Sequence, residues 1–120
     1  MSRCDLAVLG DGSMGTTLAN VVASSGKHAR LWCQSAETAA SINERGRHDR
    51  MFTDCALAPT LTATTSLAEA VQGAPLVICA VPSQSFHLVA RQLGPLVARS
   101  QVLLSATKGI DLRSLLGGAP

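Results

Sequence analysis

Residues 5–16 read D-L-A-V-L-G-D-G-S-M-G-T, and this stretch decides the fold. Residues 5–9 are a short apolar segment typical of a buried strand. Gly10, Gly12 and Gly15 follow it at the spacing G-x-G-x-x-G. Helical periodicity continues from there to Gly26, and residues 29–33 begin a second strand. A strand, a glycine-rich turn and a helix within one unit of about 30 residues predict a loop that holds the diphosphate of a dinucleotide.

Each glycine has a separate expected role. Gly10 allows the tight turn, Gly12 lets the backbone approach a pyrophosphate, and Gly15 lets the helix pack closely on the strand. The free N–H groups at the start of the helix, around Ser13, then face the phosphates.

Strand and helix patterns alternate along the rest of the chain. Strands are predicted over residues 5–9, 29–33, 61–65, 76–81 and 101–105. This alternation predicts an α/β fold, a doubly wound parallel sheet of the Rossmann type with strand order 3-2-1-4-5 and no sixth strand. Residues 76–81 are continuously apolar, as expected for a strand that is buried on both faces.

Local signals set the expected helix ends. Ser35 is a predicted N-cap for a helix that runs to about Arg45, and Gly46 follows its end. The sequence S-L-A-E at residues 66–69 is a capping box. In the first helix, apolar residues recur at helical spacing at Met14, Leu18, Val21 and Val22. The helix after Pro82 is predicted to carry Phe86, Val89, Leu93 and Leu96 on its inner side. The Gly-Pro pair at residues 94–95 is expected to kink or end the latter helix, and residues 47–60 are expected to be a loop.

Composition limits the class of protein. A chain of 120 residues with 47% hydrophobic residues is one domain with a real core. A net charge of +2 and 2% aromatic residues argue against a nucleic-acid surface. The longest apolar run, residues 76–81, is too short for a membrane span, and the N-terminus lacks a secretory pattern, so a cytoplasmic protein is expected.

The four cysteines and three histidines suggest neither a metal site nor a catalytic triad. The spacing of the cysteines matches no zinc pattern, and reduced thiols packed as small hydrophobic side chains are expected. The histidines are expected at the surface or at caps.

The region after the second strand bears on the choice of cofactor. An acid that would accept the ribose 2′-hydroxyl of NAD is absent before Glu37. No Arg follows the strand to bind the 2′-phosphate of NADP, and Gln34 can bond either ribose form. NAD and NADP both stay open, with the missing acid favouring NADP. Asp11 places a carboxylate near the expected pyrophosphate, which is electrostatically unfavourable.

Other strand ends bring further candidates to the same edge of the sheet, where ligands bind in open parallel sheets. Pro82 follows the fourth strand, and Lys108 follows the fifth.

Several motifs in order resemble one family. These are GDGSMGTTLA at residues 10–19, LW at 31–32, SINER at 41–45, AVPSQ at 80–84 and SATKGID at 105–111. They resemble the cofactor half of the bacterial-type NAD(P)-dependent glycerol-3-phosphate dehydrogenases over essentially the whole chain. The last motif is the most specific.

The resemblance implies an activity and a set of contacts. Ser13 and Met14 would lie against the dinucleotide, and Lys108 would contact both cofactor and substrate. The reaction would be hydride transfer between NAD(P)H and dihydroxyacetone phosphate, giving sn-glycerol 3-phosphate for phospholipid synthesis, in a full-length form that is a homodimer. The family's catalytic lysine lies in a second, helical domain, so no catalytic residue is expected in residues 1–120.

The chain departs from the family pattern at the dinucleotide site. The family usually has Ala at Asp11, Trp or Phe at Met14, Arg or His at Cys33 and Gln34, and an aromatic residue near Met51 and Phe52. We therefore interpret residues 1–120 as an NAD(P)-binding domain, either a fragment or a truncated paralogue. The alternatives are a non-catalytic NAD(P)-binding module and another Rossmann dehydrogenase such as a ketopantoate-reductase-like enzyme.

Overall fold

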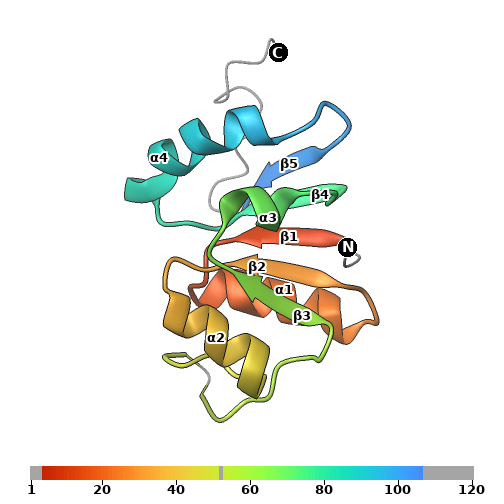
Figure 1. Cartoon of the computed structure of the whole chain (residues 1–120), viewed down its shortest axis with the longest axis vertical. Helices are drawn as coiled ribbons and strands as arrows, with labels where there is room; N and C mark the ends of the chain where they lie inside the picture. The colour runs from red at the N-terminus through yellow and green to blue at the C-terminus, as the bar shows by residue number, and fades with distance from the viewer. Residues whose placement is uncertain (1–3, 52, 107–120) are drawn as a thin grey trace.

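The structure, a computed structural model, describes residues 4–51 and 53–106, which form one parallel sheet (Figure 1). The strand order is β3-β2-β1-β4-β5, as predicted. Every neighbouring pair is parallel, and Leu6 aligns with Ala29 on one side and Leu76 on the other. The strands are β1 (Leu6–Leu9), β2 (Ala29–Trp32), β3 (Leu61–Thr64), β4 (Leu76–Cys79) and β5 (Val102–Ser105).

The helices cover both faces of the sheet, and in Figure 1 α3 lies in front of it and α1 behind it. They are α1 (Ser13–Ser24), α2 (Ala36–Arg45), α3 (Leu67–Val71) and α4 (Ser83–Leu93), and α4 runs into the short 3₁₀ helix η1 (Gly94–Leu96). One core lies under α3 and α4, and a second lies under α1 and α2. The doubly wound prediction is therefore confirmed. In the described part of the chain, no helix combines the length and apolarity needed to cross a bilayer.

The predicted caps are present, with one change. The Ser35 side chain accepts hydrogen bonds from the N–H groups of Glu37 and Thr38, and Gly46 ends α2 with φ of 68°. Ser66 caps α3 by accepting from Glu69 N–H at 3.3 Å. The reciprocal half of the capping box does not form, because the Glu69 carboxylate accepts instead from Thr64 Oγ1 at 2.9 Å.

The apolar residues that recur along α1 are not its most buried ones, and only Leu18 and Val22 among them are partly buried. Met14 and Val21 are 52% and 61% exposed, and the buried residues of the helix are Gly15, Thr16, Ala19 and Ala23. Small side chains occupy the buried stripe because α1 begins in close contact with the turn that precedes it.

The predictions for β4 and for the end of α4 need smaller corrections. The strand β4 ends at Cys79 rather than residue 81, and it is not buried on both faces, because Leu76 and Ile78 are only partly buried. They align with Val102 and Leu104 of β5, which are 52% and 48% exposed. In α4 the predicted inner residues are buried, but Leu96 is 39% exposed because the helix changes to 3₁₀ geometry at the Gly-Pro pair.

Backbone hydrogen bonds continue beyond the strand ends and build one edge of the sheet. Gly10 N–H bonds to the Trp32 carbonyl at 3.1 Å, and Ala80 N–H bonds to the Leu9 carbonyl at 2.7 Å. The glycine turn and the segments after β2 and β4 therefore meet at the carboxyl edge, where ligands bind in open parallel sheets.

Candidate functional site

A cleft of about 430 Å³ lies at this carboxyl edge. Four segments that are separate in the sequence contribute to it: the glycine turn with the start of α1, the residue Gln34 after β2, the loop after α2, and the residues after β4. Its lining residues are Gly10, Asp11, Gly12, Ser13, Met14, Gln34, Arg50, Met51, Ala80, Val81 and Pro82.

Two of the three glycines are needed by the backbone itself. Gly10 has φ of +119°, and a Cβ on it would lie 2.7 Å from the Ala80 carbonyl oxygen. A Cβ on Gly15 would lie 1.9 Å from the Gly10 carbonyl oxygen. The start of α1 thus packs directly on the turn, and no larger residue fits at either position without a backbone shift.

Gly12 differs from the other two, because a Cβ there would meet no atom within 4 Å. It is the N-cap of α1 with φ of −72°, so neither strain nor crowding requires glycine. No side chain caps the helix, and its first turn has no acidic residue. Amide groups at a helix start with open space before them form a cradle suited to a phosphate, and the residues present fit a dinucleotide diphosphate.

His48 connects Arg50 and Met51, which line the cleft, to the glycine turn. Its side chain is 1% exposed. The ring nitrogen Nδ1 accepts from the N–H groups of Arg50 and Met51 at 3.0 and 3.1 Å, so Nε2 carries the proton and donates to the Asp11 carbonyl at 2.8 Å. One neutral imidazole therefore fixes two lining residues relative to the turn, and the expectation that all histidines lie at the surface or at caps is wrong for His48.

Among the described residues, the carboxylate of Asp11 and the guanidinium of Arg50 line the cleft, and the Asp49 carboxylate lies beside Arg50. Arg50 Nη2 lies 3.6 Å from Asp11 Oδ2, and Arg50 Nε lies 3.9 Å from Asp49 Oδ1. The Asp49 carboxylate is itself held by Thr38 Oγ1 at 2.7 Å. The Asp11 side chain is 11% exposed and that of Arg50 is 63% exposed. Asp11 thus faces a cation, and Arg50 extends into the solvent at the mouth of the cleft.

The pKa of the buried Cys33 thiol is affected by these charges. Its pKa is raised from 9.0 to about 12, chiefly because burial disfavours the thiolate. The carboxylates of Asp11 and Asp49 act in the same direction, and the guanidinium of Arg50 opposes them. All three charges therefore lie within electrostatic reach of the end of β2.

The structure brings most of the sequence-predicted site residues together. Gly10, Gly12, Ser13, Met14, Gln34 and Pro82 all line the cleft. Gly15 is not a lining residue, but it packs closely against the Gly10 carbonyl oxygen of the turn. Lys108 lies outside the described residues.

Sequence reasoning missed the arginine at the cleft. Only the residues directly after the second strand were considered as contacts for a 2′-phosphate, whereas Arg50 belongs to the irregular segment after α2. The family resemblance pointed to this segment near Met51 and Phe52, but Phe52 lies outside the described residues. The helical and strand periodicities carry no signal for Arg50, because the buried His48 ring determines its place.

The cysteines are free, and the packing predicted for them holds for three of the four. Cys33 and Cys79 are buried, Cys4 is partly buried, and Cys55 is exposed, so the expectation of packed thiols is wrong for Cys55. Cys55 lies in the loop before β3.

Comparisons with known proteins show the family to which the chain belongs. Residues 5–116 match the family described as the NAD-dependent glycerol-3-phosphate dehydrogenase N-terminus. Glycerol-3-phosphate dehydrogenase [NAD(P)+] of Alcanivorax borkumensis is 41% identical over 87% of this chain and 30% of its own length. That of Corynebacterium jeikeium is 40% identical over 88% of this chain and 32% of its own length.

A solved structure extends the likeness to three dimensions. The glycerol-3-phosphate dehydrogenase of Coxiella burnetii superposes with a TM-score of 0.82 at 29% identity, covering 93% of this chain and 36% of that one. The chain therefore spans about a third of the length of the relatives that it matches. It belongs to the NAD-dependent glycerol-3-phosphate dehydrogenase family, and it corresponds to the N-terminal part of that family.

Proposed function

We propose that this chain is the dinucleotide-binding part of an NAD(P)-dependent glycerol-3-phosphate dehydrogenase. The reaction is hydride transfer between NAD(P)H and dihydroxyacetone phosphate, with sn-glycerol 3-phosphate as the product. The observation that carries the proposal is the cradle at Gly12, where backbone amides at the start of α1 face open space in the cleft.

The residues of the cleft divide into expected contacts. The amides around Gly12 and Ser13 bind the diphosphate, and Gln34 lies at the adenosine ribose because it follows β2. Met14 and Pro82 contact the nicotinamide side, and Lys108 contacts both cofactor and substrate. The bound cofactor supplies the hydride, and the protein supplies its position and its electrostatic surroundings.

The substrate-binding and proton-donating groups are proposed to lie in the helical domain of the complete enzyme. Hydride transfer to a carbonyl needs a proton donor at the carbonyl oxygen and a clamp for the substrate phosphate. With residues 1–120 alone, we expect dinucleotide binding and no measurable reduction of dihydroxyacetone phosphate.

The test joins residues 1–120 to the helical domain of a full-length relative. Oxidation of NADH and of NADPH is followed with dihydroxyacetone phosphate present and absent. We expect substrate-dependent turnover in the fusion, and loss of most of it in Lys108→Ala. Turnover by residues 1–120 alone would contradict this division of labour, and dinucleotide binding without turnover in the fusion would favour the non-catalytic binding module.

A further inference from the structure

We propose that Arg50 binds the adenosine 2′-phosphate and makes this cleft selective for NADP(H) over NAD(H). The inference rests on the proposed function, because it assumes that a dinucleotide occupies the cleft with its diphosphate at Gly12.

The position of Arg50 relative to β2 is the first support. In dinucleotide-binding folds the residue that selects the 2′ group follows the second strand, as an acid for a hydroxyl or with an Arg nearby for a phosphate. Gln34 occupies that region here, and Arg50 lines the same cleft. Gln34 itself brings no negative charge, and the acids nearest to Arg50 are Asp11 and Asp49. Arg50 is thus the one lining residue that brings a positive charge to this part of the cleft among the residues that the structure describes.

The backbone of Arg50 is fixed rather than free. Its N–H donates to His48 Nδ1 at 3.0 Å, and His48 Nε2 donates to the Asp11 carbonyl at 2.8 Å. The segment is tied to α2 as well, because Ser41 Oγ donates to the Arg47 carbonyl at 2.6 Å. The base of the arginine side chain therefore holds a defined position relative to the phosphate cradle, and the binding of a phosphate needs no reordering of the loop.

The Arg50 guanidinium keeps N–H donors available for a ligand. Its distances to Asp11 and Asp49 are 3.6 and 3.9 Å, which are ion-pair contacts longer than a normal hydrogen bond. A guanidinium offers five N–H donors in a planar fork that fits a phosphate bidentately. With 63% of the side chain exposed, the two carboxylates orient the group without enclosing it.

Electrostatics places the charge near the end of β2. Burial chiefly raises the pKa of the Cys33 thiol, the Asp11 and Asp49 carboxylates raise it further, and the Arg50 guanidinium lowers it. Cys33 directly precedes Gln34, so this effect agrees with a cation close to the expected ribose position.

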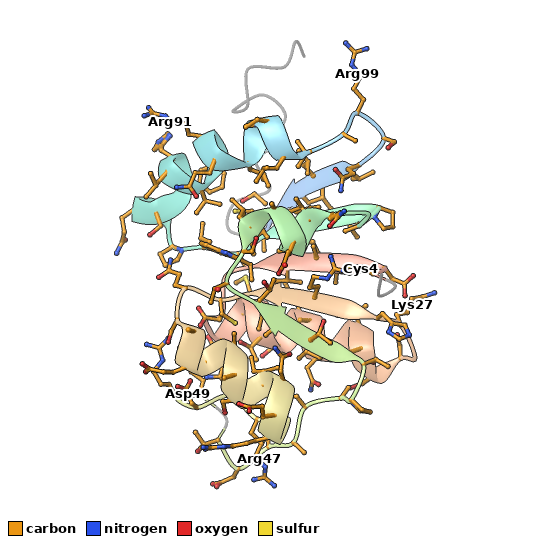
Figure 2. The ribbon with its side chains drawn as sticks, viewed as in Figure 1. Cys4, Lys27, Arg47, Asp49, Arg91 and Arg99 are labelled. Atoms are coloured by element: carbon orange, nitrogen blue, oxygen red, sulfur yellow. The ribbon has the colours of Figure 1, made fainter. Side chains whose placement is uncertain are left out.

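The test compares NADPH and NADH binding to the 120-residue chain by calorimetric titration. Arg50→Gln removes the charge and keeps a polar side chain. The matched control is Arg47→Gln, because Arg47 belongs to the same loop but contacts the Thr53 carbonyl at 3.3 Å and lies at the lower edge of the molecule in Figure 2. Adenosine 2′,5′-bisphosphate and adenosine 5′-monophosphate serve as smaller probes of the same difference.

We expect the wild-type chain to prefer NADPH. Arg50→Gln should weaken NADPH binding about tenfold, equivalent to about 1.4 kcal/mol, and change NADH binding less than about twofold. The bisphosphate should lose affinity in the same way and the monophosphate should not. Arg47→Gln should leave both ratios unchanged.

Two other results would overturn the inference. Equal losses for NADPH and NADH would assign Arg50 to the diphosphate, and no loss for either would leave it without a contact. Failure of the wild-type chain to bind either dinucleotide would contradict the proposed function itself, and this inference with it.

Discussion

At the residue scale, the cleft is governed by a few charges and one buried ring. Asp11 stands between the first two glycines, and its two ends have different roles. Its carbonyl accepts from Thr16 Oγ1 and His48 Nε2, while its carboxylate faces Arg50. The backbone part of Asp11 is structural, and the side chain is a negative charge beside a phosphate cradle.

The first prediction concerns this charge. Asp11→Ala should tighten NADPH and NADH binding several-fold, because it removes a like charge near two phosphates and releases Arg50, while the backbone carbonyl keeps its two hydrogen bonds. Calorimetry at low and high salt measures the change, which should shrink as salt screens the charge. Asp54→Ala is the control, since Asp54 is an exposed acid outside the cleft. Weaker binding in Asp11→Ala would show that the orientation of Arg50 matters more than the repulsion.

The second prediction concerns the Cys33 thiol. Its pKa is raised to about 12 in the folded chain, so the thiol stays protonated while the unfolded chain ionises above the ordinary value of 9.0. Its contribution to the free energy of unfolding is complete below pH 9 and is lost as the pH rises toward 12. Urea unfolding between pH 8 and 10.5 should show a shallower alkaline decline in Cys33→Ala than in wild type, by at most about 1.4 kcal/mol per pH unit.

Cys55→Ala provides the matched comparison, because Cys55 is exposed. Its stability should fall with pH in parallel with that of the wild type. A Cys33→Ala curve that is also parallel would contradict the assignment of a raised pKa to this thiol.

At the scale of the elements, the sequence predicted the order of strands and helices well because the signals are local. Caps such as Ser35 and Gly46 act within a few residues, and strand β1 is apolar throughout. Burial was predicted less well where tertiary contacts decide it. The stripe of α1 that faces the sheet consists of small residues, which a search for large apolar side chains cannot find.

The same distinction applies to the site. The glycine turn was predictable because the spacing of its glycines is a local sequence pattern: Gly10 and Gly15 are required by close backbone contacts, and Gly12 faces open space. The position of Arg50 beside the turn was not predictable. It depends on the hydrogen bond between the His48 side chain and the Asp11 carbonyl, two residues that lie 37 positions apart in the sequence. Hydrogen bonds between distant segments leave no periodic trace in a single sequence.

The third prediction separates the two kinds of glycine in this turn. Gly15→Ala should lower the free energy of unfolding by about 1–3 kcal/mol, because its Cβ would meet the Gly10 carbonyl oxygen at 1.9 Å. Gly12→Ala should stay within about 0.5 kcal/mol of wild type, since nothing lies within 4 Å and the backbone is unstrained. Urea unfolding measures both. Equal losses would mean that the close contact of α1 with the turn is not as described.

At the scale of the whole molecule, the described residues form a five-stranded sheet whose carboxyl edge carries the cleft. The four segments that line it follow β1, β2, α2 and β4, whose places in the fold are seen in Figure 1. The sheet fixes these ends relative to one another through its hydrogen bonds. A change at Gly12 can therefore alter ligand binding without disturbing the frame.

Calorimetric titration of the wild-type chain and of Gly12→Val with NADPH tests directly whether the glycine turn binds the diphosphate. We predict one binding site per wild-type chain and no detectable binding to Gly12→Val, whose side chain would fill the space before the α1 amides. The variant should keep the circular dichroism spectrum and nearly the melting temperature of the wild type. A folded Gly12→Val that binds NADPH with the wild-type affinity would contradict the assignment of this turn as the phosphate cradle.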